Sequence, residues 1–414
     1  MNKLYADLEK RGLINQVTHE ELKERLNSPI SLYCGFDPTA DSLHIGHLLP
    51  LCMLKRFANA GHKPIALIGG ATGLIGDPSF KKDERSLNTK ETVEGYVEAI
   101  TKQIIDILDD DNIIIANNYE WVGNLNTIDF LRDYGKHFTI NYMTSKDSVA
   151  SRVESGLSFT EFSYMLLQAM DFYQLCKRYG TQLQIGGSDQ WGNITTGLEL
   201  IRREGIDKEC FGLTVPLVTK SDGTKFGKTE GGAIWLDPKK TSPYEFYQYF
   251  YNVEDKDVIK YLKYFTFIDM DKIEELESLT IEKPFLREAQ KVLASEVTKF
   301  VHGEEVLNQV LEITNCLFTG DISHLTKEQI ETYFTDIKQY VIKPNMPLVD
   351  ALIDIELATS KRESREFINN KSIRINGNLI EDENHVISSE DLIEDTYMMV
   401  KRGKKKIHFV KVEK

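Results

Sequence analysis

The first half of the chain alternates short apolar runs with longer stretches in which apolar residues recur every three or four positions. The apolar runs, typical of buried strands, are residues 30–36, 65–68, 113–116, 183–185 and 213–218. Residues 92–108 and 160–178 have the spacing of amphipathic helices that cross over between parallel strands. This rhythm predicts an α/β fold with a Rossmann-like parallel sheet, on which ligands bind beyond the carboxyl ends of the strands.

After Pro243 the pattern changes to one helical period after another, with no convincing strand between them. Further on, Gly320, Pro344 and Pro347 interrupt it, and two short amphipathic stretches and the turn Asn376-Gly377 follow. We therefore expect an α-helical domain and then a small α+β domain after the sheet. The expected divisions are 1–230 for the sheet domain, 231–325 for the helical domain, 326–346 for a linker and 347–414 for the last domain.

Composition is that of an ordinary soluble protein, with 41% hydrophobic and 28% charged residues, and a length of 414 residues exceeds what one core normally organises. No apolar run reaches the roughly 18 residues that a membrane helix needs. We therefore expect a cytoplasmic protein with no membrane partner. The five cysteines are scattered, without a Cys-x-x-Cys pair, so we expect neither disulfides nor a metal site.

The formal net charge of −14 argues against a surface that coats nucleic acid, because phosphate binding needs concentrated Lys and Arg. Residues 401–414 differ, since they hold seven Lys or Arg and one Glu. This basic end indicates a separate surface that faces RNA. The alternative is a small folded appendage with a solvated basic face.

A strand and a Pro-containing turn lead to His44-Ile45-Gly46-His47, where a helix is expected to begin. Free N–H groups at a helix start, a glycine that admits a nucleotide and two imidazoles on one face make a phosphate site. Alone the motif is weak, because two histidines near a glycine are more often capped surface groups. The preceding Gly35-Phe36-Asp37-Pro38-Thr39 strengthens the phosphate interpretation. Pro50, early in the same helix, is expected to bend it or to cost a hydrogen bond.

A second basic segment, Lys225-Phe226-Gly227-Lys228-Thr229, follows the last expected strand in a glycine-rich loop. Two ammonium groups and a hydroxyl there can neutralise a departing pyrophosphate. The segment is not a Walker A loop, which would need glycine where Asp222 stands. The stretch 69–76 also fails as a dinucleotide fingerprint, because Ala71 occupies a glycine position, and this disfavours a hydride-transferring oxidoreductase.

Tyr164, Gln168 and Asp171 fall on one stripe of an expected helix that is otherwise mostly apolar. Buried polar groups need partners, and these are either internal hydrogen bonds or a polar ligand. The spacing alone leaves both open. Nearby, residues 184–193 end a strand in a glycine pair, where the backbone either contacts a ribose or adenine or simply turns.

Taken together, His44 to His47 and Lys225 to Thr229 resemble the HIGH and KMSKS motifs of class I aminoacyl-tRNA synthetases. The order of these segments, with the Tyr164 stripe between them, resembles the bacterial tyrosyl branch over nearly the whole chain. The last domain resembles an S4-type RNA-binding module through residues 358–365 and 375–377. The resemblance implies that ATP, accompanied by Mg²⁺, activates L-tyrosine for transfer to tRNA(Tyr), in a symmetric homodimer.

The resemblance also implies roles for individual residues. In the tyrosine site, Tyr33 and Asp171 would hold the phenol hydroxyl, and Tyr164, Gln168 and Asp77 the ammonium group, with Gln190 beside them. The catalytic residues at the ATP phosphates would be Thr39, His44, His47, Lys225, Lys228 and Thr229. ATP would also contact Gly35, Asp37, Gly46, Gly187 and Asp189, together with Lys81, Lys82 and Arg85 of a charged loop.

Two other interpretations compete with this one. A tryptophan ligase or a small nucleotidyltransferase can carry the same first motif, but Tyr33 together with Asp171 disfavours both. An RNA-binding relative that has lost activity would be expected to carry a broken His or Lys motif, and both motifs are intact here.

Overall fold

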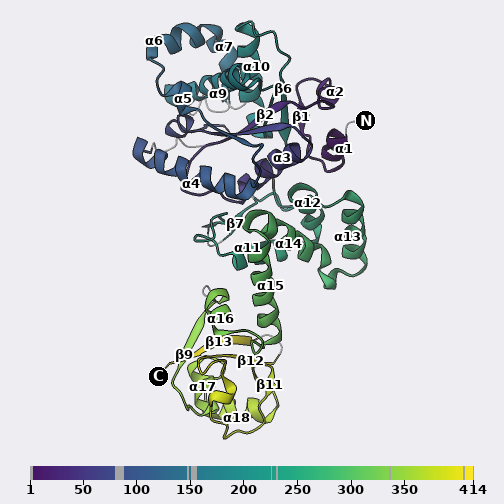
Figure 1. The fold of residues 1–414 in the computed structure, drawn as a ribbon, viewed down its shortest axis with the longest axis vertical. Coiled ribbons are helices and arrows are strands. Elements are labelled where there is room, and N and C mark those ends of the chain that lie inside the picture. The colour runs from purple at the N-terminus through teal and green to yellow at the C-terminus, as the bar shows by residue number, and fades with distance from the viewer. Residues whose placement is uncertain are drawn as a thin grey trace. The chain divides into compact units, whose positions relative to one another are not determined.

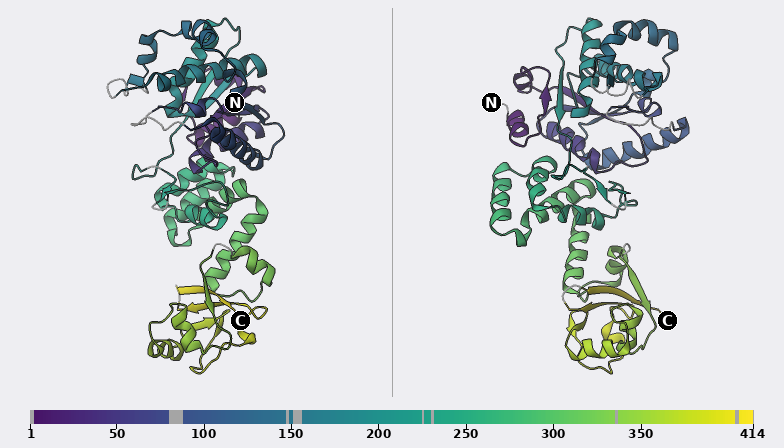
Figure 2. Two further views of the ribbon diagram at one scale, coloured as in Figure 1. Left: turned by 90° about the vertical axis from the view of Figure 1, so that its left-hand side faces the viewer. Right: turned by 180° about the vertical axis from the view of Figure 1, so that it is seen from behind.

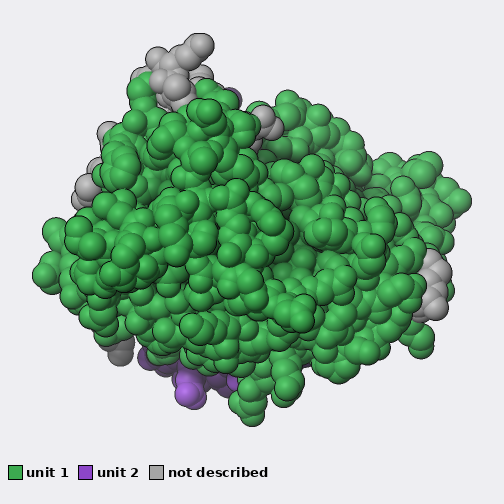
Figure 3. Space-filling view, turned by 90° about the horizontal axis from the view of Figure 1, so that it is seen from above, with its two compact units in different colours: residues 1–241, 245–302 green, residues 242–244, 303–414 purple. Residues whose placement is uncertain are grey.

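The computed structural model of the chain forms two compact units, coloured separately in Figure 3. Unit 1 comprises Met1–Thr241 and Glu245–His302, and unit 2 comprises Ser242–Tyr244 and Gly303–Lys414. The structure describes residues 3–79, 88–146, 149–150, 156–224, 226–229, 232–334, 337–403 and 406–413.

Six strands form the main sheet within the described part of unit 1, in the order β1-β6-β5-β2-β3-β4. Their bounds are β1 Gln16–Val17, β2 Ser31–Phe36, β3 Lys63–Ile68, β4 Ile114–Asn117, β5 Leu183–Gly187 and β6 Phe211–Val215. Only the pairing of β1 with β6 is antiparallel. The chain runs outward from β2 through β3 to β4 and then returns to β5 on the other side of β2. The order therefore reverses beside β2, where such sheets bind ligands.

Helices cover both faces of this sheet, α3 and α4 on one side and α9 and α10 on the other (Figures 1 and 2). Their bounds are α3 Leu48–Asn59, α4 Lys90–Leu108, α9 Phe159–Tyr179 and α10 Trp191–Arg203. The hydroxyl of Ser158 caps α9 by accepting a hydrogen bond from the N–H of Glu161, and Gly180, at φ 65°, ends the helix in the left-handed conformation.

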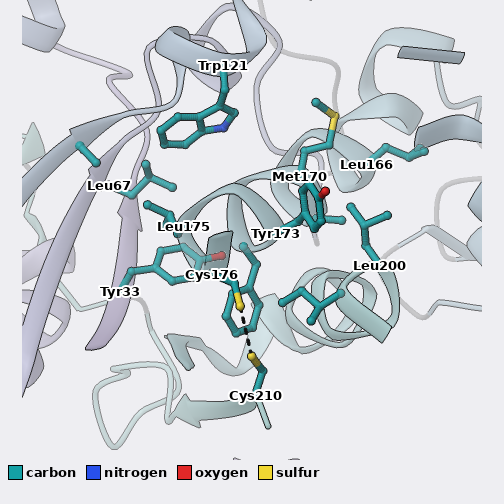
Figure 4. Close-up of a cluster of buried hydrophobic side chains, with 14 of the residues drawn as sticks. Tyr33, Leu67, Trp121, Leu166, Met170, Tyr173, Leu175, Cys176, Leu200 and Cys210 are labelled. Carbon is teal, nitrogen blue, oxygen red and sulfur yellow. Dashed lines mark hydrogen bonds between the residues drawn. The ribbon is translucent and has the colours of Figure 1, made fainter. Parts of the chain in front are cut away.

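The core on the α9 side joins apolar side chains of the sheet to those of α9 and α10 (Figure 4). Leu67 comes from β3, Phe172 and Leu175 from α9, and Leu200 from α10. The short helices α5 Tyr119–Val122 and α7 Ile140–Thr144 contribute side chains to this core. The other short helices of this part are α1 Lys3–Lys10, α2 Leu22–Arg25 and α6 Thr127–Asp129. This packing fixes the position of α9 relative to the sheet.

Four α-helices follow the sheet, as the helical periods after Pro243 predict: α11 Pro243–Tyr251, α12 Asp255–Phe265, α13 Met270–Glu282 and α14 Glu288–His302. Two buried arginines connect α12 to the first part of unit 1. Arg11 donates to the carbonyl oxygen of Ile268 at 2.6 Å, and Arg56, from α3, donates to that of Thr266. Cations at the carbonyl end of a helix are favourable, and these two fix α12 against α3.

In the described part of unit 2 the sheet order is β11-β10-β12-β13-β9, and only β9 runs parallel to its neighbour. The strands are β9 Gln339–Ile342, β10 Ile373–Ile375, β11 Asn378–Leu379, β12 Tyr397–Arg402 and β13 Lys406–Val412, and the helices are α15 Glu304–Thr319, α16 Lys327–Tyr333, α17 Leu348–Asp354 and α18 Lys361–Asn369. Asn376 and Gly377, at φ 43° and 81°, form the expected hairpin turn. The stretch expected as a linker holds α16 and β9.

Across the residues that the structure describes, no helix combines the length and the apolar character needed to cross a membrane.

Candidate functional site

Buried and half-buried polar side chains of β2, α9 and the segments after β3, β4 and β5 lie together, most of them joined by hydrogen bonds, and we call the space that they surround the pocket. Tyr33 of β2 is 1% exposed, and its ring lies 5.4 Å from that of Phe172, measured between centroids. Its hydroxyl has no hydrogen-bond partner among the described residues. Burial, together with the charge of nearby Asp171, raises the pKa of Tyr33 well above its usual value. A buried hydroxyl without a partner is costly, so this one is available to a polar ligand.

Asp171, on α9, is held by two donors from the end of β4 and from α5. Asn118 Nδ2 donates to Oδ2 at 3.0 Å, and Trp121 Nε1 donates to Oδ1 at 2.8 Å. Burial raises the pKa of Asp171 to about 7, although both hydrogen bonds act to lower it. Each carboxylate oxygen keeps further acceptor capacity. The carboxylate is therefore fixed in place and can still accept a hydrogen bond from a ligand.

Asp37, just after β2, is linked to Asp171 through a chain of hydrogen bonds. Tyr164 donates to Asp37 Oδ2 at 2.7 Å, and Thr72 donates to Oδ1 at 2.7 Å. Asn118 donates to the hydroxyl oxygen of Thr72 at 3.0 Å. Burial and the nearby charge of Asp37 raise the pKa of Tyr164 well above its usual value. The network keeps Tyr164 a neutral donor and fixes its direction.

A second network joins α9 to the loops after β3 and β5. Gln168 Nε2 donates to Gln190 Oε1 at 3.2 Å, and Gln190 Nε2 donates to Asp77 Oδ2 at 2.8 Å. Asn193 Nδ2 also donates to Gln190 Oε1, at 3.0 Å. Within the described residues, the buried Oε1 of Gln168 has no hydrogen-bond donor. This oxygen and the Asp77 carboxylate form an acceptor-rich end of the pocket, suited to a cation.

The two histidines of the first motif lie side by side, with ring centroids 4.2 Å apart. Gly46 N donates to His44 Nδ1 at 3.0 Å, and His44 N donates to His47 Nδ1 at 3.2 Å. Burial, followed by repulsion from His44, lowers the pKa of His47 to about 3, although the residue as a whole is only partly buried. His47 is therefore neutral at pH 7. Because its Nδ1 accepts, its proton is on Nε2, which can donate to a ligand.

Glycine at position 46 leaves room for the His44 ring, because a Cβ there would lie 2.6 Å from an atom of that ring. The chain forms a short 3-10 turn over Ile45–His47 before α3 begins at Leu48. Pro50 is thus in the first turn of α3, where an N–H group would have no partner within the helix. The hydrogen-bond cost expected for Pro50 does not arise.

The second motif lies against the first. A Cβ on Gly227 would be 2.7 Å from Ile45 Cγ1, and Ile45 N donates to the carbonyl oxygen of Ile234 at 3.0 Å. Phe226, beside Gly227, packs into an aromatic cluster with Phe265 of α12, at 5.3 Å between centroids. The two motifs, whose glycines Gly46 and Gly227 are 181 positions apart in the sequence, therefore belong to neighbouring segments.

Not every expected site residue is described. Lys81, Lys82, Arg85 and Lys225 lie outside the described residues, and Lys228 and Thr229 are described only as the backbone of the short strand β7 (Lys228–Thr229), which pairs with β8 (Gly232–Ala233). Thr39 lies in the turn after β2, where its N–H donates to the carbonyl oxygen of Asp37 at 2.9 Å.

Glycines on the two neighbouring strand ends leave space near this network. Gly35, in β2, is exposed, with no atom within 4 Å of where a Cβ would lie. A Cβ on Gly187, the last residue of β5, would lie 2.5 Å from Asp189 Oδ1. Gly187 thus allows Asp189 to fold close to the strand end, and Gly35 leaves an open surface beside it.

Sequence reasoning missed four polar residues that hold the pocket together: Thr72, Asn118, Trp121 and Asn193. Asn118 is fully buried and directly follows β4, so a polar residue at the carboxyl end of a predicted parallel strand was the available signal. Trp121 gave no such signal, because its indole contacts Asp171 only in the folded chain.

Comparisons with known proteins show the family to which the chain is similar. A model described as tRNA synthetases class I (W and Y) matches residues 24–319, and a tyrosine–tRNA ligase SYY-like C-terminal domain matches residues 329–410. The chain is 55% identical over 415 aligned positions to tyrosine–tRNA ligase 1 of Bacillus cereus and to the tyrosine–tRNA ligase of Geobacillus stearothermophilus, in each case covering 99% of both chains. A C-terminally truncated mitochondrial tyrosyl-tRNA synthetase of Aspergillus nidulans is similar in structure, with a TM-score of 0.69 and 31% identity, over 77% of this chain and 95% of that one.

Proposed function

The chain belongs to the tyrosine–tRNA ligases among the class I tRNA synthetases, and from its geometry we propose which residues carry that activity. This activity first joins L-tyrosine to the AMP part of ATP, which forms tyrosyl-adenylate and releases pyrophosphate. It then transfers tyrosine to tRNA. The observation that supports our assignment best is the unpartnered hydroxyl of Tyr33 beside the doubly held carboxylate of Asp171.

We assign the phenol of the substrate to this pair. The substrate hydroxyl donates to Asp171 and accepts from Tyr33. Tyr33 thereby gains the hydrogen-bond partner that it lacks, and Asp171 accepts one further hydrogen bond. Phenylalanine would leave the hydroxyl of Tyr33 without a partner and would give Asp171 no further donor. The pocket therefore selects tyrosine through the cost of an unmade hydrogen bond.

The ammonium group of tyrosine is assigned to the other end of the pocket. The oxygen of Gln168 and the carboxylate of Asp77 accept from it, and Gln190 orients both by bonding to each of them. Tyr164, which we also assign to the ammonium group, donates its hydroxyl hydrogen to Asp37. It would therefore receive an ammonium hydrogen through its free lone pairs.

ATP is assigned to the surface next to the carboxylate of the bound tyrosine. Gly35, Gly187 and Asp189 would contact the nucleoside, with Asp37 orienting Tyr164 beneath it. Attack by the tyrosine carboxylate on the α-phosphorus needs no covalent residue, only alignment and charge stabilisation. The Nδ1 atoms of His44 and His47 each accept a backbone hydrogen bond, so both rings have their proton on Nε2. Each Nε2–H would then donate to a phosphate oxygen.

The remaining phosphate ligands are assigned from the motif alone. Thr39, Lys225, Lys228 and Thr229 would bind the pyrophosphate, assisted by Lys81, Lys82 and Arg85, and the placement of Gly227 against Ile45 supports the first group. Mg²⁺ prefers oxygen ligands, which the ATP phosphates supply, whereas the side chains assigned to those phosphates are imidazole, hydroxyl, ammonium and guanidinium groups. We therefore propose that Mg²⁺ enters with ATP and assign it no protein ligand.

For the rest of the molecule we propose a homodimer in the cytoplasm, where ATP and tRNA are found. Exposed apolar side chains between residues 128 and 159 support self-association, among them Ile128 at 67%, Ile140 at 63% and Phe159 at 71%. We also propose that residues 1–230 catalyse, 231–325 lie on the anticodon side and 347–414 bind RNA, joined by 326–346.

The decisive experiment is ATP–pyrophosphate exchange with tyrosine, tryptophan and phenylalanine as separate substrates. We expect exchange with tyrosine alone, followed by charging of tRNA(Tyr). Exchange driven by tryptophan, or exchange rates equal for tyrosine and phenylalanine, would overturn the assignment of the pocket. A tyrosine analogue without the ammonium group should bind weakly to the wild type and be insensitive to Gln168→Ala.

A further inference from the structure

We propose that Glu312, Cys316 and His324, all in unit 2, form a binding site for one zinc-type dication. One ligand atom from each residue lies within 4.8 Å of the other two. The three residues belong to the end of α15 and to the loop after it, and none of them takes part in the pocket of unit 1. The inference is therefore independent of the proposed function.

The distances are close to those of a tetrahedral site. Cys316 Sγ lies 3.8 Å from Glu312 Oε1 and 3.9 Å from His324 Nε2. Zinc bonds of about 2.3 Å to sulfur and about 2.0 Å to nitrogen or oxygen place sulfur roughly 3.5 Å from each of the other ligands. Glu312 Oε1 and His324 Nε2 are 2.5 Å apart and share a hydrogen bond, so they would separate by roughly 1 Å as the metal replaces the shared proton.

The backbone holds the three ligands where they are. Glu312 and Cys316 are four residues apart on α15, which places them on one face of the helix. Gly320, at φ 78°, ends the helix and turns the chain back. Ile322 and Leu325, at 0% and 5% exposed, anchor the loop in the core on either side of His324. A site whose ligands are fixed by buried neighbours loses little entropy when it binds metal.

The set of donors selects the class of metal. A thiolate, an imidazole and a carboxylate suit Zn²⁺ or Co²⁺, whereas Mg²⁺ and Ca²⁺ prefer oxygen ligands only. Cys316 is buried, but the side chains of His324 and Glu312 are 46% and 36% exposed, so water can complete the coordination. Such a site fastens α15 to the loop that leads into α16. The expectation of no metal site rested on the lack of a Cys-x-x-Cys pair, which this arrangement does not need.

Metal binding forms a sulfur–metal bond at Cys316 and releases the thiol proton to solvent. Without metal the same residues would be a surface ion pair above a cysteine that simply fills the core, and the experiment below separates these two states.

The test uses the full-length protein, stripped with a chelator and titrated with Co²⁺, which gives a sulfur-to-cobalt charge-transfer band when a thiolate binds. We expect one equivalent to bind, Zn²⁺ to displace it, and excess Mg²⁺ to leave it in place. His324→Gln and Glu312→Gln, both near the surface, should each weaken binding at least about tenfold. Cys210→Ser is the matched control, because it removes a buried thiol outside the proposed site, 3.7 Å from the sulfur of Cys176, and it should bind like the wild type.

Several results would overturn the proposal. These are the absence of a charge-transfer band in the wild type, binding by His324→Gln equal to that of the wild type, or loss of the band in Cys210→Ser. Circular dichroism confirms that each variant is folded, so the outcome does not depend on Cys316→Ser, whose buried substitution can unfold the unit. As an independent readout, Zn²⁺ should raise the melting temperature of the wild type and not that of His324→Gln.

Discussion

At the scale of single residues, the pocket leaves polar atoms without protein partners and fixes their neighbours firmly. The hydroxyl of Tyr33 and the Oε1 of Gln168 are buried without partners among the described residues, while Asp171 and Gln190 are each held by at least two hydrogen bonds. Each unpartnered atom costs stability in the free protein. A ligand that forms the missing hydrogen bonds recovers this cost. At these positions, therefore, the same side chains lower the stability of the free protein and raise its selectivity for the ligand.

Tyr33→Phe tests this opposition directly. The variant should lose about 1–3 kcal/mol of discrimination between tyrosine and phenylalanine, roughly 5- to 150-fold in relative kcat/KM for pyrophosphate exchange. Because the hydroxyl is unpartnered in the free protein, the melting temperature should not fall. Tyr173→Phe makes the same change in the same core, near Glu204, and should leave the discrimination as it is. A Tyr33→Phe protein that discriminates like the wild type would contradict the assignment.

Asp171 should give unit 1 a characteristic dependence on pH. Its folded-state pKa of about 7 lies above the ordinary value of about 3.9, so the folded protein holds a proton that the unfolded chain releases. The free energy of unfolding therefore contains a part that is present below pH 4 and is lost as the pH rises to about 7. Asp171→Asn should remove this part and flatten the slope. Urea unfolding at a series of pH values, followed by tryptophan fluorescence, measures it, since Trp121, Trp191 and Trp235 all lie in unit 1.

His47 should contribute with the opposite sign. Its pKa of about 3 is below the ordinary value of about 6.5, so the unfolded chain takes up a proton that the folded protein excludes. The stability that this gives is complete above pH 6.5 and is lost as the pH falls toward 3. His47→Asn should therefore lose less stability on acidification than the wild type does. Equal acid sensitivity of the two proteins would mean that the imidazole is not neutral when folded.

At the scale of elements, α9 is the carrier of the pocket, since it presents Tyr164, Gln168 and Asp171 from one stripe. Ser158→Ala removes the cap of its first turn and should cost about 1 kcal/mol of stability. Because Tyr164 follows within two turns, KM for tyrosine should rise more than kcat falls. Ser158→Asp keeps a capping oxygen and adds a charge that the helix start favours, so it should restore both values. Failure of Ser158→Asp to restore them would refute a role for capping.

Elements buried on both sides could be predicted from the sequence, because their apolar runs are continuous. The expected strands at 30–36 and 65–68 match β2 and β3 within two residues, and the expected fold and function are confirmed. β1, of two residues, and β9, with only Ile342 buried, are too short or too exposed for a pattern. The contacts of Asn118 and Trp121 arise on folding. The position of Asn118 directly after β4 was a local signal, whereas no local pattern indicated Trp121.

At the scale of the whole molecule, the described part of the candidate site lies entirely in unit 1. A chain that ends at His302 should therefore retain pyrophosphate exchange within about twofold of the wild type, but lose charging of tRNA, which we assign to the remaining residues. Exchange and aminoacylation measured on the same preparation separate the two effects. Loss of exchange in a truncated protein with normal circular dichroism would show that the site needs residues beyond unit 1.

The basic end of the chain also serves the fold of unit 2. Lys401 Nζ donates to the carbonyl oxygens of Phe318 and Thr319 at the end of α15, at 2.8 and 3.1 Å, and Arg402 donates to that of Leu357. These two cations already donate hydrogen bonds to carbonyl oxygens of a helix and a loop. They would therefore bind a phosphate group less strongly than cations without such bonds. The expected RNA-facing surface must depend more on the other cations, such as Arg362 and Arg365 of α18.

The pairing of β9 with β13 constrains where the chain can be cut. β9 precedes α17 in the sequence, yet it covers the outer side of β13 through registered contacts from Gln339 with Phe409 to Ile342 with Val412. A fragment that began at residue 347 would keep α17, α18 and the hairpin of β12 and β13. It would expose a row of unpaired amide and carbonyl groups along β13. Bare strand edges attract strands from other molecules. Such a fragment would tend to join with copies of itself, whereas one that began just before Gln339 would remain dispersed.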